Sequence, residues 1–318
     1  MIFAVIRAIL GTLLFPGIVF TLIMSFWLAG MDRVLVARMQ RRVGPPLLQP
    51  VWDVLKCLGK ETLIPRKANK TIYIAAPLIG LASVFVTAVF LPAAGMKAFD
   101  FNGDVIVVLY LLTLASVMLI VGSAASGSPF AGVGLSREMV AMISYELPFV
   151  LVLLAVGRCA AGDETVTFSL SRIADWQRSF GPLILKPTLL PAAAAMLFVI
   201  PCEAGQQPLD IDEAETEICE GVLAEYSGKP LAMFKMMHNV KMYIMSGLFC
   251  VLFLNFQTGI LPLDIVLYAI SCSLVAFVSM SVPHAIMARL RVEQVFRFYW
   301  TGVTCLAALS LVLVWLGL

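Results

Sequence analysis

The segment 203–228 concentrates carboxylates, the side chains best suited to bind and release protons or to attract cations. Like charges at such short spacing repel one another, so some of these groups should keep protons above their usual pKa or need cations nearby. The segment therefore favours proton or cation handling. It has no basic residue and eight acidic ones, Glu203, Asp210, Asp212, Glu213, Glu215, Glu217, Glu220 and Glu225.

Local signals predict a short helix within this segment. Asp210 and Glu213 resemble a capping box after Pro208, so the helix would begin near Ile211 and stop at Gly221. A solvated helix whose first-turn carboxylates only favour the helix dipole is the alternative interpretation. One face of the predicted helix would carry four carboxylates, those of Asp210, Glu213, Glu217 and Glu220.

Three more ionisable residues, Arg137, Glu138 and Glu146, follow a Gly/Ser-rich loop and lie in or next to an apolar run. A spacing of eight residues places Glu138 and Glu146 about 80° apart around a helix and about 12 Å apart along it. The two could therefore line one hydrated path, because ionisable groups inside a membrane usually face the bundle interior. Alternatively, Arg137 and Glu138 reach the membrane edge and only Glu146 is buried in the membrane.

His238 begins another apolar run and lies between Lys235 and Lys241. Histidine exchanges protons near neutral pH, although a lone histidine is more often a structural group. Its position between two lysines and near the acidic segment favours a proton carrier. The two lysines could simply balance nearby carboxylates.

The composition identifies the class of protein that must position these groups. Hydrophobic residues make up 61% of the 318 residues, charged residues make up 13%, and the mean hydropathy is +0.96. Such a chain is an integral membrane protein. A net charge of +2 gives no indication of nucleic-acid binding. The seven cysteines form no C-x-x-C pair, so we expect no metal or iron–sulfur site on this chain.

Apolar runs long enough to cross about 30 Å of hydrocarbon predict an all-α fold with about eight transmembrane helices. We interpret the first run as a retained span, not a signal peptide. Without an internal repeat, one multi-pass domain over 1–318 is the simplest expectation. The predicted spans are 8–30, 72–92, 104–123, 138–157, 183–202, 238–256, 264–285 and 299–317.

Lysine and arginine gather on one side of the predicted topology. The segment 32–70 holds nine of the 22 basic residues, and the loop after the seventh span adds Arg289, Arg291 and Arg297. The positive-inside rule assigns this side to the cytoplasm. The expected cytoplasmic loops are about 31–71, 123–137, 203–237 and 286–298.

The first of these loops contains a predicted amphipathic helix. Pro50 suits its first turn. The helix could lie on the membrane surface, or its apolar side could dock a soluble partner. That side would consist of Val51, Val54, Leu55 and Leu58.

Four motifs in order give the chain a family resemblance that covers nearly its whole length. They are A-R-M-Q-R-R-V-G-P-P-L-L-Q-P-V-W-D-V-L-K-C-L-G-K-E, M-I-S-Y-E, P-L-D-I-D-E-A-E-T-E-I-C-E-G-V-L-A-E-Y-S-G and A-R-L-R-V-E-Q. These motifs resemble the H subunit of respiratory complex I and the homologous membrane subunit of group 4 energy-converting NiFe hydrogenases. The sequence G-S-P-F followed by S-R-E (Ser136 to Glu138) is similar to the hydrogenase branch, as is the short G-P-P-L-L-Q-P.

The resemblance implies a subunit that joins a peripheral electron-transfer arm to an ion-pumping membrane arm. It also implies a location in a prokaryotic cell (inner) membrane, and no catalytic residue is expected on this chain. His238 departs from the family pattern, since many relatives have a glutamate there. The expected ion-coupling residues are Glu138, Glu146, Glu203, Asp210, Glu213, Glu215, Glu217, Glu225 and His238. The expected loop and interface residues are Arg41, Arg42, Arg137, Tyr226, Arg289 and Arg291.

The function that we expect is that of a coupling subunit in a ferredoxin-dependent, hydrogen-evolving NiFe hydrogenase that moves protons or sodium ions. The NiFe centre and iron–sulfur clusters would belong to partners, namely the hydrogenase large and small subunits and a ferredoxin-like iron–sulfur subunit. Antiporter-like membrane subunits would lie beside this chain. The main alternative is the quinone-chamber subunit of a complex I-type quinone oxidoreductase. Two further alternatives explain less. A self-standing transporter would be expected to show an inverted repeat. A purely structural anchor leaves Glu146 and the acidic segment unexplained.

Overall fold

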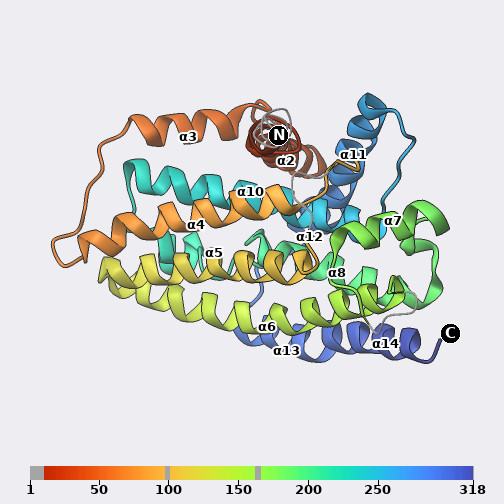
Figure 1. The fold of residues 1–318 in the computed structure, drawn as a ribbon. Helices are drawn as coiled ribbons and strands as arrows, with labels where there is room; N and C mark the ends of the chain where they lie inside the picture. The colour runs from red at the N-terminus through yellow and green to blue at the C-terminus, as the bar shows by residue number, and fades with distance from the viewer. Residues whose placement is uncertain (1–10, 97–100, 162–165, 318) are drawn as a thin grey trace.

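The computed structural model describes residues 11–96, 101–161 and 166–317, which are helical and contain no β-strand (Figure 1). Seven of its helices are long and apolar enough to cross a membrane, and Pro187–Glu203 forms a shorter apolar helix. The prediction of an all-α integral membrane protein is therefore confirmed. Residues 8–10 of the first predicted span lie outside the described ranges. The seven long helices are Gly11–Met39, Lys70–Phe90, Asp104–Ser126, Pro129–Cys159, Gly228–Phe253, Leu261–Ile286 and Val292–Trp315.

The helix α10 (Gly228–Phe253) is the centre of the bundle. Its membrane window is 89% buried within the chain, whereas no other candidate span exceeds 50%. It is also the least hydrophobic of the seven, because it carries Lys235, His238 and Lys241. A polar helix is stable in the middle of a membrane bundle when protein, not lipid, surrounds it. Its neighbours are α2 (Ile18–Met39), α3 (Gln49–Gly59), α4 (Lys70–Phe90), α8 (Leu190–Glu203) and α11 (Leu261–Ala276).

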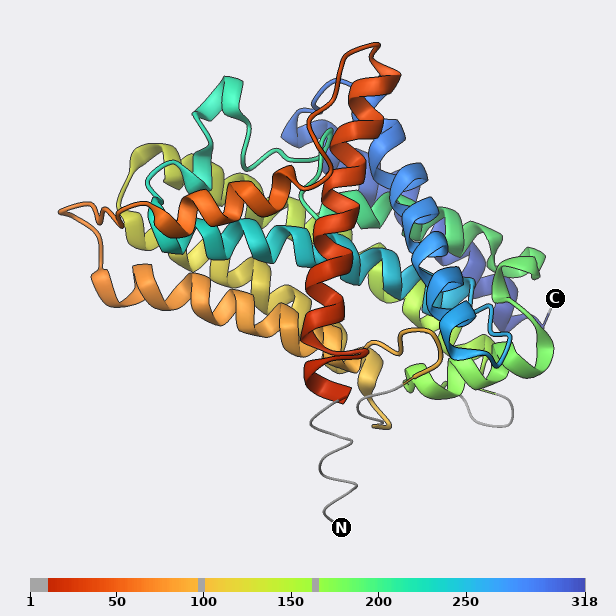
Figure 2. The same cartoon turned by 90° about the horizontal axis from the view of Figure 1, so that it is seen from above.

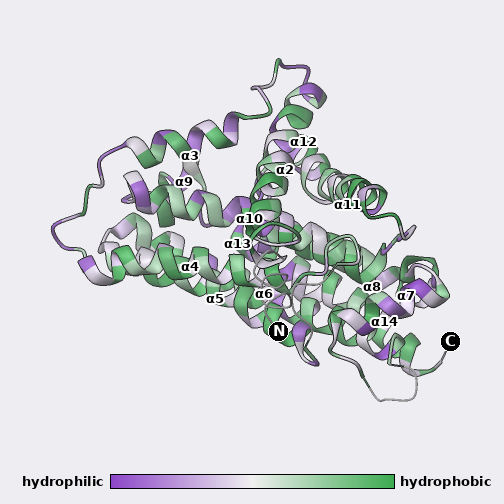
Figure 3. Cartoon of the chain, turned by 45° about the horizontal axis from the view of Figure 1, so that its top comes forward, coloured by the Kyte–Doolittle hydropathy of each residue, from purple (hydrophilic) through white to green (hydrophobic). Residues whose placement is uncertain are grey.

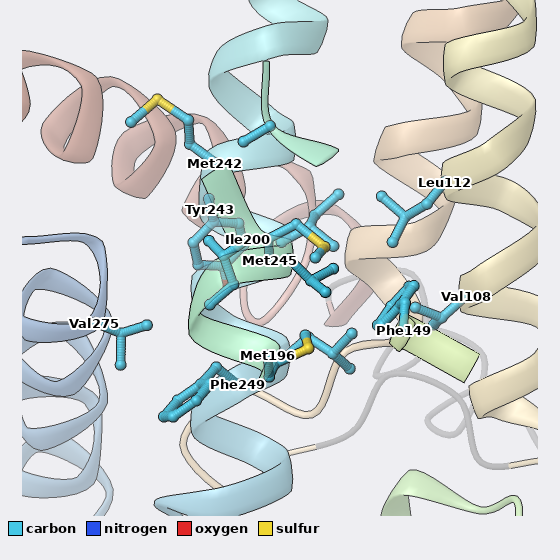
Figure 4. Close-up of a cluster of buried hydrophobic side chains, with 14 of the residues drawn as sticks. Val108, Leu112, Phe149, Met196, Ile200, Met242, Tyr243, Met245, Phe249 and Val275 are labelled. Atoms are coloured by element: carbon cyan, nitrogen blue, oxygen red, sulfur yellow. The ribbon is translucent and has the colours of Figure 1, made fainter. Parts of the chain in front are cut away.

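Two sets of helices surround α10. The helices α4, α5 (Asp104–Ser126) and α6 (Pro129–Cys159) run beside it in the same general direction, and α14 (Thr304–Trp315) packs along α6 (Figure 1). The helix α2 crosses α10 steeply (Figure 2). Close packing holds these layers together: Met245 and Phe249 of α10 lie between Leu112 and Phe149 on one side and Val275 on the other (Figure 4).

Many of the hydrophilic segments lie at one end of the bundle, which we call the loop end, and α7 (Leu170–Phe180) at the opposite end is also hydrophilic in part (Figure 3). Backbone hydrogen bonds join segments at this end that are distant in sequence. The amide of Asn69 donates to the carbonyl of Ala125, and that of Leu290 donates to Pro208. Short helices lie here, including α3, α9 (Glu215–Ile218), α12 (Val282–Ile286) and α13 (Val292–Arg297).

Two long helices begin inside predicted loops. The helix α6 starts at Pro129, a favourable first-turn residue, and α10 starts at Gly228. Glu138 and His238 are therefore helical residues that lie well inside their helices. The last two spans are longer than predicted and contain π-helical segments at Phe277–Ser281 and Phe298–Val303.

The fifth predicted span, 183–202, is not one continuous helix. Two 3-10 turns, Leu183–Leu185 and Pro187–Leu189, precede α8. Prolines 182, 187 and 191 interrupt the amide donors in this stretch, so a regular helix is established only from Leu190 onward. This shortening explains why α8 is not among the seven full-length spans.

The predicted helix from Ile211 to Gly221 is wrong. Only Glu215–Ile218 is α-helical, and the residue before it is Ala214, which has no capping side chain. Asp210 and Glu217 instead bind arginines from elsewhere in the chain. The four carboxylates predicted to share one helical face therefore point in different directions.

The helix α3 is confirmed, but its predicted apolar side is only partly correct. Val54 and Cys57 pack against Ala232 of α10. Leu55 and Leu58 are exposed, 51% and 40% respectively. One side of α3 thus belongs to the bundle, and the other remains available to a membrane or a partner.

The acidic segment lies directly on the first turns of α6. A Cβ atom at Gly134 would be 2.7 Å from the amide nitrogen of Val222 and 3.0 Å from the carbonyl oxygen of Asp212. Backbone atoms cannot rotate away from such a contact as side chains can. The absence of a side chain at Gly134 therefore fixes how closely the acidic segment approaches α6.

We predict that Gly134→Ala destabilises this contact by roughly 1–3 kcal/mol, the usual range for overpacking. Limited proteolysis of the acidic segment in the detergent-purified protein measures the effect, with faster cleavage expected in the variant. Gly132→Ala is the matched control, since nothing lies within 4 Å of a Cβ at that position on the same helix. Equal cleavage rates for the two variants would contradict the proposed role of Gly134.

Candidate functional site

Two neighbouring cavities lie between the acidic segment and the loop end of α10. The larger, which we call the outer cavity, has a volume of about 230 Å³. The smaller, the inner cavity, has about 30 Å³. Three residues, Glu213, Phe234 and His238, line both cavities and so mark the boundary between them. Charged groups thus form a continuous path from the loop end into the bundle.

The inner cavity brings together four carboxylates and a lysine. The carboxylates are those of Glu138, Glu203, Asp212 and Glu213, contributed by α6, α8 and the acidic segment. Lys241 enters from α10, and its Nζ lies 3.1 Å from Oε1 of Glu203. The side chains of this ion pair are only 6% and 1% exposed. A pair so deeply buried must be fully compensated, because an unpaired charge there would be strongly destabilising.

Glu213 and Asp212 lie side by side in the acidic segment and interact electrostatically. Burial, together with the charges of Asp212 and Asp210, raises the pKa of the Glu213 carboxyl to about 8. Burial also raises the pKa of Asp212 to about 6, although hydrogen bonds from backbone amides oppose the shift. One of these two neighbours therefore holds a proton near neutral pH, as expected for a proton-handling site.

The outer cavity has charged walls of both signs. Nη1 of Arg33 donates to Oδ2 of Asp53 at 2.6 Å, which ties α2 to α3. Lys235 and Glu220 line the same cavity. At its inner wall, Nε2 of His238 lies 2.7 Å from Nε2 of Gln206. If the Gln206 amide donates, the imidazole nitrogen accepts, so the ring is neutral in this arrangement.

Two arginines hold the acidic segment against the bundle. Arg289 donates to Asp210 through Nε (3.1 Å) and Nη2 (2.7 Å), a bidentate and charge-assisted contact. Arg137 of α6 donates through Nη1 to Oε2 of Glu217 at 2.6 Å. These predicted loop residues therefore position the segment that carries Asp212 and Glu213.

Tyr226 anchors the other end of the acidic segment. Its ring stacks on Tyr73 with centroids 4.2 Å apart and contacts Phe234 edge-on. The hydroxyl of Tyr73 donates to the main-chain carbonyl of Glu225 at 2.7 Å. The predicted interface residue Tyr226 is thus part of a buried aromatic cluster between α4 and α10.

Several predicted residues lie outside both cavities. Glu146 is half-buried on α6, and it does not line the inner cavity with Glu138. The side chain of Glu215 is outside the described part of the structure. Glu225, Arg41, Arg42 and Arg291 are exposed at the loop end.

Sequence reasoning misses three charged groups near this site. The sequence pattern gives Lys241 only a possible role in balancing nearby carboxylates, and it gives Asp212 no separate role. Asp32 of α2 is buried and accepts a hydrogen bond from Ser281 at 2.7 Å, while Nδ1 of His284 lies 3.3 Å from its other oxygen. A charged residue within an apolar run is the signal that could have identified Asp32.

The inner cavity combines carboxylates with a lysine, and both kinds of group exchange protons. Among the described residues, no group of three or more His, Cys, Asp or Glu side chains is placed to hold a metal ion. A lysine lies where a bound cation would neutralise the carboxylates. Chemically, the arrangement can accept, store and pass on protons.

We predict that Glu213 contributes a pH dependence of stability. The folded state keeps this carboxyl protonated up to about pH 8, whereas its ordinary pKa is 4.5. Between these values the folded state binds the extra proton, so the free energy of unfolding should fall as the pH rises. Thermal unfolding across this range should show a shallower dependence in Glu213→Gln.

Infrared titration gives an independent measurement of the same group. A carboxylic-acid band that titrates near pH 8 should disappear in Glu213→Gln. Glu293→Gln, at an exposed position of α13, is the control and should retain the band. A band that persists unchanged in Glu213→Gln would show that another group carries the proton.

A family model described as NADH dehydrogenase matches residues 12–315 of the chain. The H subunit of NADH-quinone oxidoreductase from Syntrophotalea carbinolica is 32% identical over 322 residues, covering 95% of this chain and 94% of that protein. Hydrogenase-4 component C from Escherichia coli is 32% identical over 315 residues, covering 97% and 94%.

A solved structure has the same fold. It is that of the membrane-bound sulfane sulfur reductase, an archaeal respiratory membrane complex, with a TM-score of 0.87 and 26% identity. The match covers 97% of this chain and 98% of the chain in that complex. These matches extend over all four motifs on which the resemblance rested, and the chain therefore belongs to the NADH dehydrogenase family.

Proposed function

We propose that this chain is the membrane-embedded coupling subunit of a multisubunit, complex I-like oxidoreductase. Electron transfer in a peripheral arm would drive ion translocation through the membrane arm. The observation that carries the proposal is the series of ionisable groups that line two adjoining cavities, from the more open outer cavity through Glu213 to the buried pair of Glu203 and Lys241. Buried ionisable groups are costly in a membrane and are usually functional.

The acidic segment is the part that responds to redox turnover in this proposal. A partner that docks at the loop end would contact the segment or the arginines that hold it, Arg137 and Arg289. A small displacement would change the hydration and charge around Glu213 and Asp212, which connect the cavities. Two positions of the segment with different proton affinities would bias proton uptake in one direction.

Glu146 is the residue from which we expect a proton to leave this subunit. It is half-buried on a membrane-spanning helix and feels the charge of Glu203. A carboxylate on the outer surface of a membrane bundle needs a partner that shields it from lipid. An adjoining antiporter-like membrane subunit would provide that cover and receive the proton, or exchange it for a sodium ion.

We further propose that the complex belongs to the ferredoxin-dependent, hydrogen-evolving NiFe hydrogenase branch. Its NiFe centre and iron–sulfur clusters would lie on the large, small and ferredoxin-like partner subunits, which would dock at the cytoplasmic face of the cell membrane. The short G-P-P-L-L-Q-P loop and the Ser136–Arg137–Glu138 motif support this branch. Hydrogenase-4 component C and the sulfane sulfur reductase chain match over almost their full length.

The alternative function, a quinone chamber, fits the outer cavity less well. Sites for apolar ring compounds are lined predominantly by hydrophobic and aromatic side chains. Here Arg33, Asp53, Glu213, Lys235 and His238 make up much of the wall. Such a surface is better matched to water and protons than to a lipid-soluble quinone.

The coupling proposal predicts that Glu213→Gln and Glu203→Gln each lower the number of ions moved per electron well below the wild-type ratio, because each variant removes a carboxyl that can carry a proton. Sealed vesicles that contain the assembled complex allow ion uptake and electron transfer to be measured together. Glu61→Gln, an exposed loop position, controls for the loss of one carboxylate. Normal ion-to-electron ratios in both cavity variants would refute the proposal.

The hydrogenase branch is tested on the complex purified through a tag on this chain. We expect nickel in the particle, hydrogen evolution from reduced ferredoxin, and no inhibition by quinone analogues. A nickel-free particle that reduces quinone would support the alternative branch. Copurification without any redox subunit would contradict both branches.

A further inference from the structure

Lys241 has three oxygen neighbours deep inside the bundle. Its Nζ donates to Oγ of Ser116 at 2.6 Å and to the main-chain oxygen of Glu203 at 3.4 Å. Oε1 of Glu203 lies 3.1 Å away as its ion-pair partner and has no hydrogen bond of its own among the described residues. Lys241 is only 5% exposed. The charge of Glu203 and two hydrogen bonds therefore surround this buried amine.

Hydrogen bonding continues from Lys241 beyond the inner cavity. Oγ of Ser116 lies 3.4 Å from the hydroxyl oxygen of Tyr145, and either oxygen can be the donor. Ser116 and Tyr145 are buried and do not line the inner cavity. They belong to α5 and α6, whereas Glu203 and Lys241 belong to α8 and α10. The Tyr145 hydroxyl also interacts with the Glu203 carboxyl, so the four helices meet in one cluster of polar atoms beside the cavity.

The protonation state of Glu203 affects that of Lys241, because the two charges compensate each other. When Glu203 takes up a proton from the inner cavity, it loses the negative charge that compensates Lys241. An unpaired ammonium in this buried position is strongly unfavourable. Loss of one proton from Lys241 restores neutrality. The hydroxyl of Ser116, at 2.6 Å, is its nearest acceptor outside the pair.

We propose that Lys241 is a proton-carrying residue, through which a proton arriving at Glu203 displaces a proton into the Ser116–Tyr145 chain. This inference rests on the proposed coupling function and identifies the transported ion at this point as a proton. It assigns Ser116 and Tyr145, two residues without a carboxylate, to the path that leads toward Glu146 on α6.

The transfer balances without any electron or co-reactant. A cavity proton binds a carboxylate oxygen of Glu203, and an N–H bond of Lys241 breaks as Oγ of Ser116 gains that proton. Ser116 releases its own hydroxyl proton to Tyr145, and Tyr145 gives up its own hydroxyl proton to a carboxylate further along the path, for which Glu146 is the proposed acceptor. The protonated Glu203 then returns its proton to the neutral amine, and the ion pair forms again. One proton has crossed from the cavity to α6.

Lys241→Arg tests this inference directly. An arginine keeps the positive charge and can pair with Glu203, but it does not release a proton under physiological conditions. We expect the number of protons moved per electron to fall well below the wild-type ratio in vesicles that contain the assembled complex. Lys229→Arg, at an exposed position of the same helix, is the matched control and should pump normally. If Lys241→Arg moved as many protons per electron as the wild type, Lys241 would be only a fixed counter-charge and the inference would be overturned.

A second variant covers the case in which the larger arginine prevents assembly. Glu203→Gln combined with Lys241→Gln removes both charges and leaves a neutral, hydrogen-bonding pair. If the double variant assembles and loses proton transport, the inference is supported; if it assembles and transports normally, the inference is overturned.

Glu213→Gln distinguishes a failure of the Lys241 inference from a failure of the coupling function. If Glu213→Gln uncouples while Lys241→Arg pumps normally, only the inference about Lys241 fails. If Glu213→Gln also pumps normally, the coupling function itself fails.

Discussion

A charge inside a membrane bundle is stable only where another charge or a set of hydrogen bonds compensates it, and the buried pair of Lys241 and Glu203 meets this requirement. The pair lies where α5, α6, α8 and α10 approach one another, so those helices must surround it closely enough to exclude lipid. This explains why the least hydrophobic of the long helices is also the most buried one. The large apolar surfaces of the other spans face outward or pack against its neighbours.

The same constraint shapes the loop end. Asp210 and Glu217 belong to a segment rich in negative charge, and each is paired with an arginine from another part of the chain. With those two carboxylates neutralised, Asp212 and Glu213 can be turned inward, where burial favours their protonated forms. The segment therefore forms a lid whose outer carboxylates fix its position and whose inner carboxylates line the inner cavity. Gly134 sets the distance between this lid and α6.

The fold class could be predicted from sequence because long apolar runs have few alternatives to membrane helices. The conformation of the acidic segment could not be predicted in this way. Capping and spacing rules consider only neighbouring residues, whereas Arg289 binds Asp210 from 79 positions away. The same limit applies to Lys241. Its neighbours in sequence suggest a role in balancing charge, but its contacts with Ser116 and Glu203 depend on three helices that meet only in the folded bundle. Glu138 and Glu146 are correctly predicted to share one helix, yet the angle between them is large enough that only Glu138 lines the inner cavity.

The size of the inner cavity has a consequence for the kinetics of the path. A volume of about 30 Å³ accommodates roughly one or two water molecules. Proton conduction through so small a space requires an unbroken chain of hydrogen bonds. The presence of a single water molecule can decide whether that chain is complete. Gly205 lines this cavity, and a Cβ atom there would lie 3.3 Å from the His238 ring, so even one methyl group would compete with solvent for the space. A proton path through this cavity would therefore be complete when a water molecule occupies it and broken when none does.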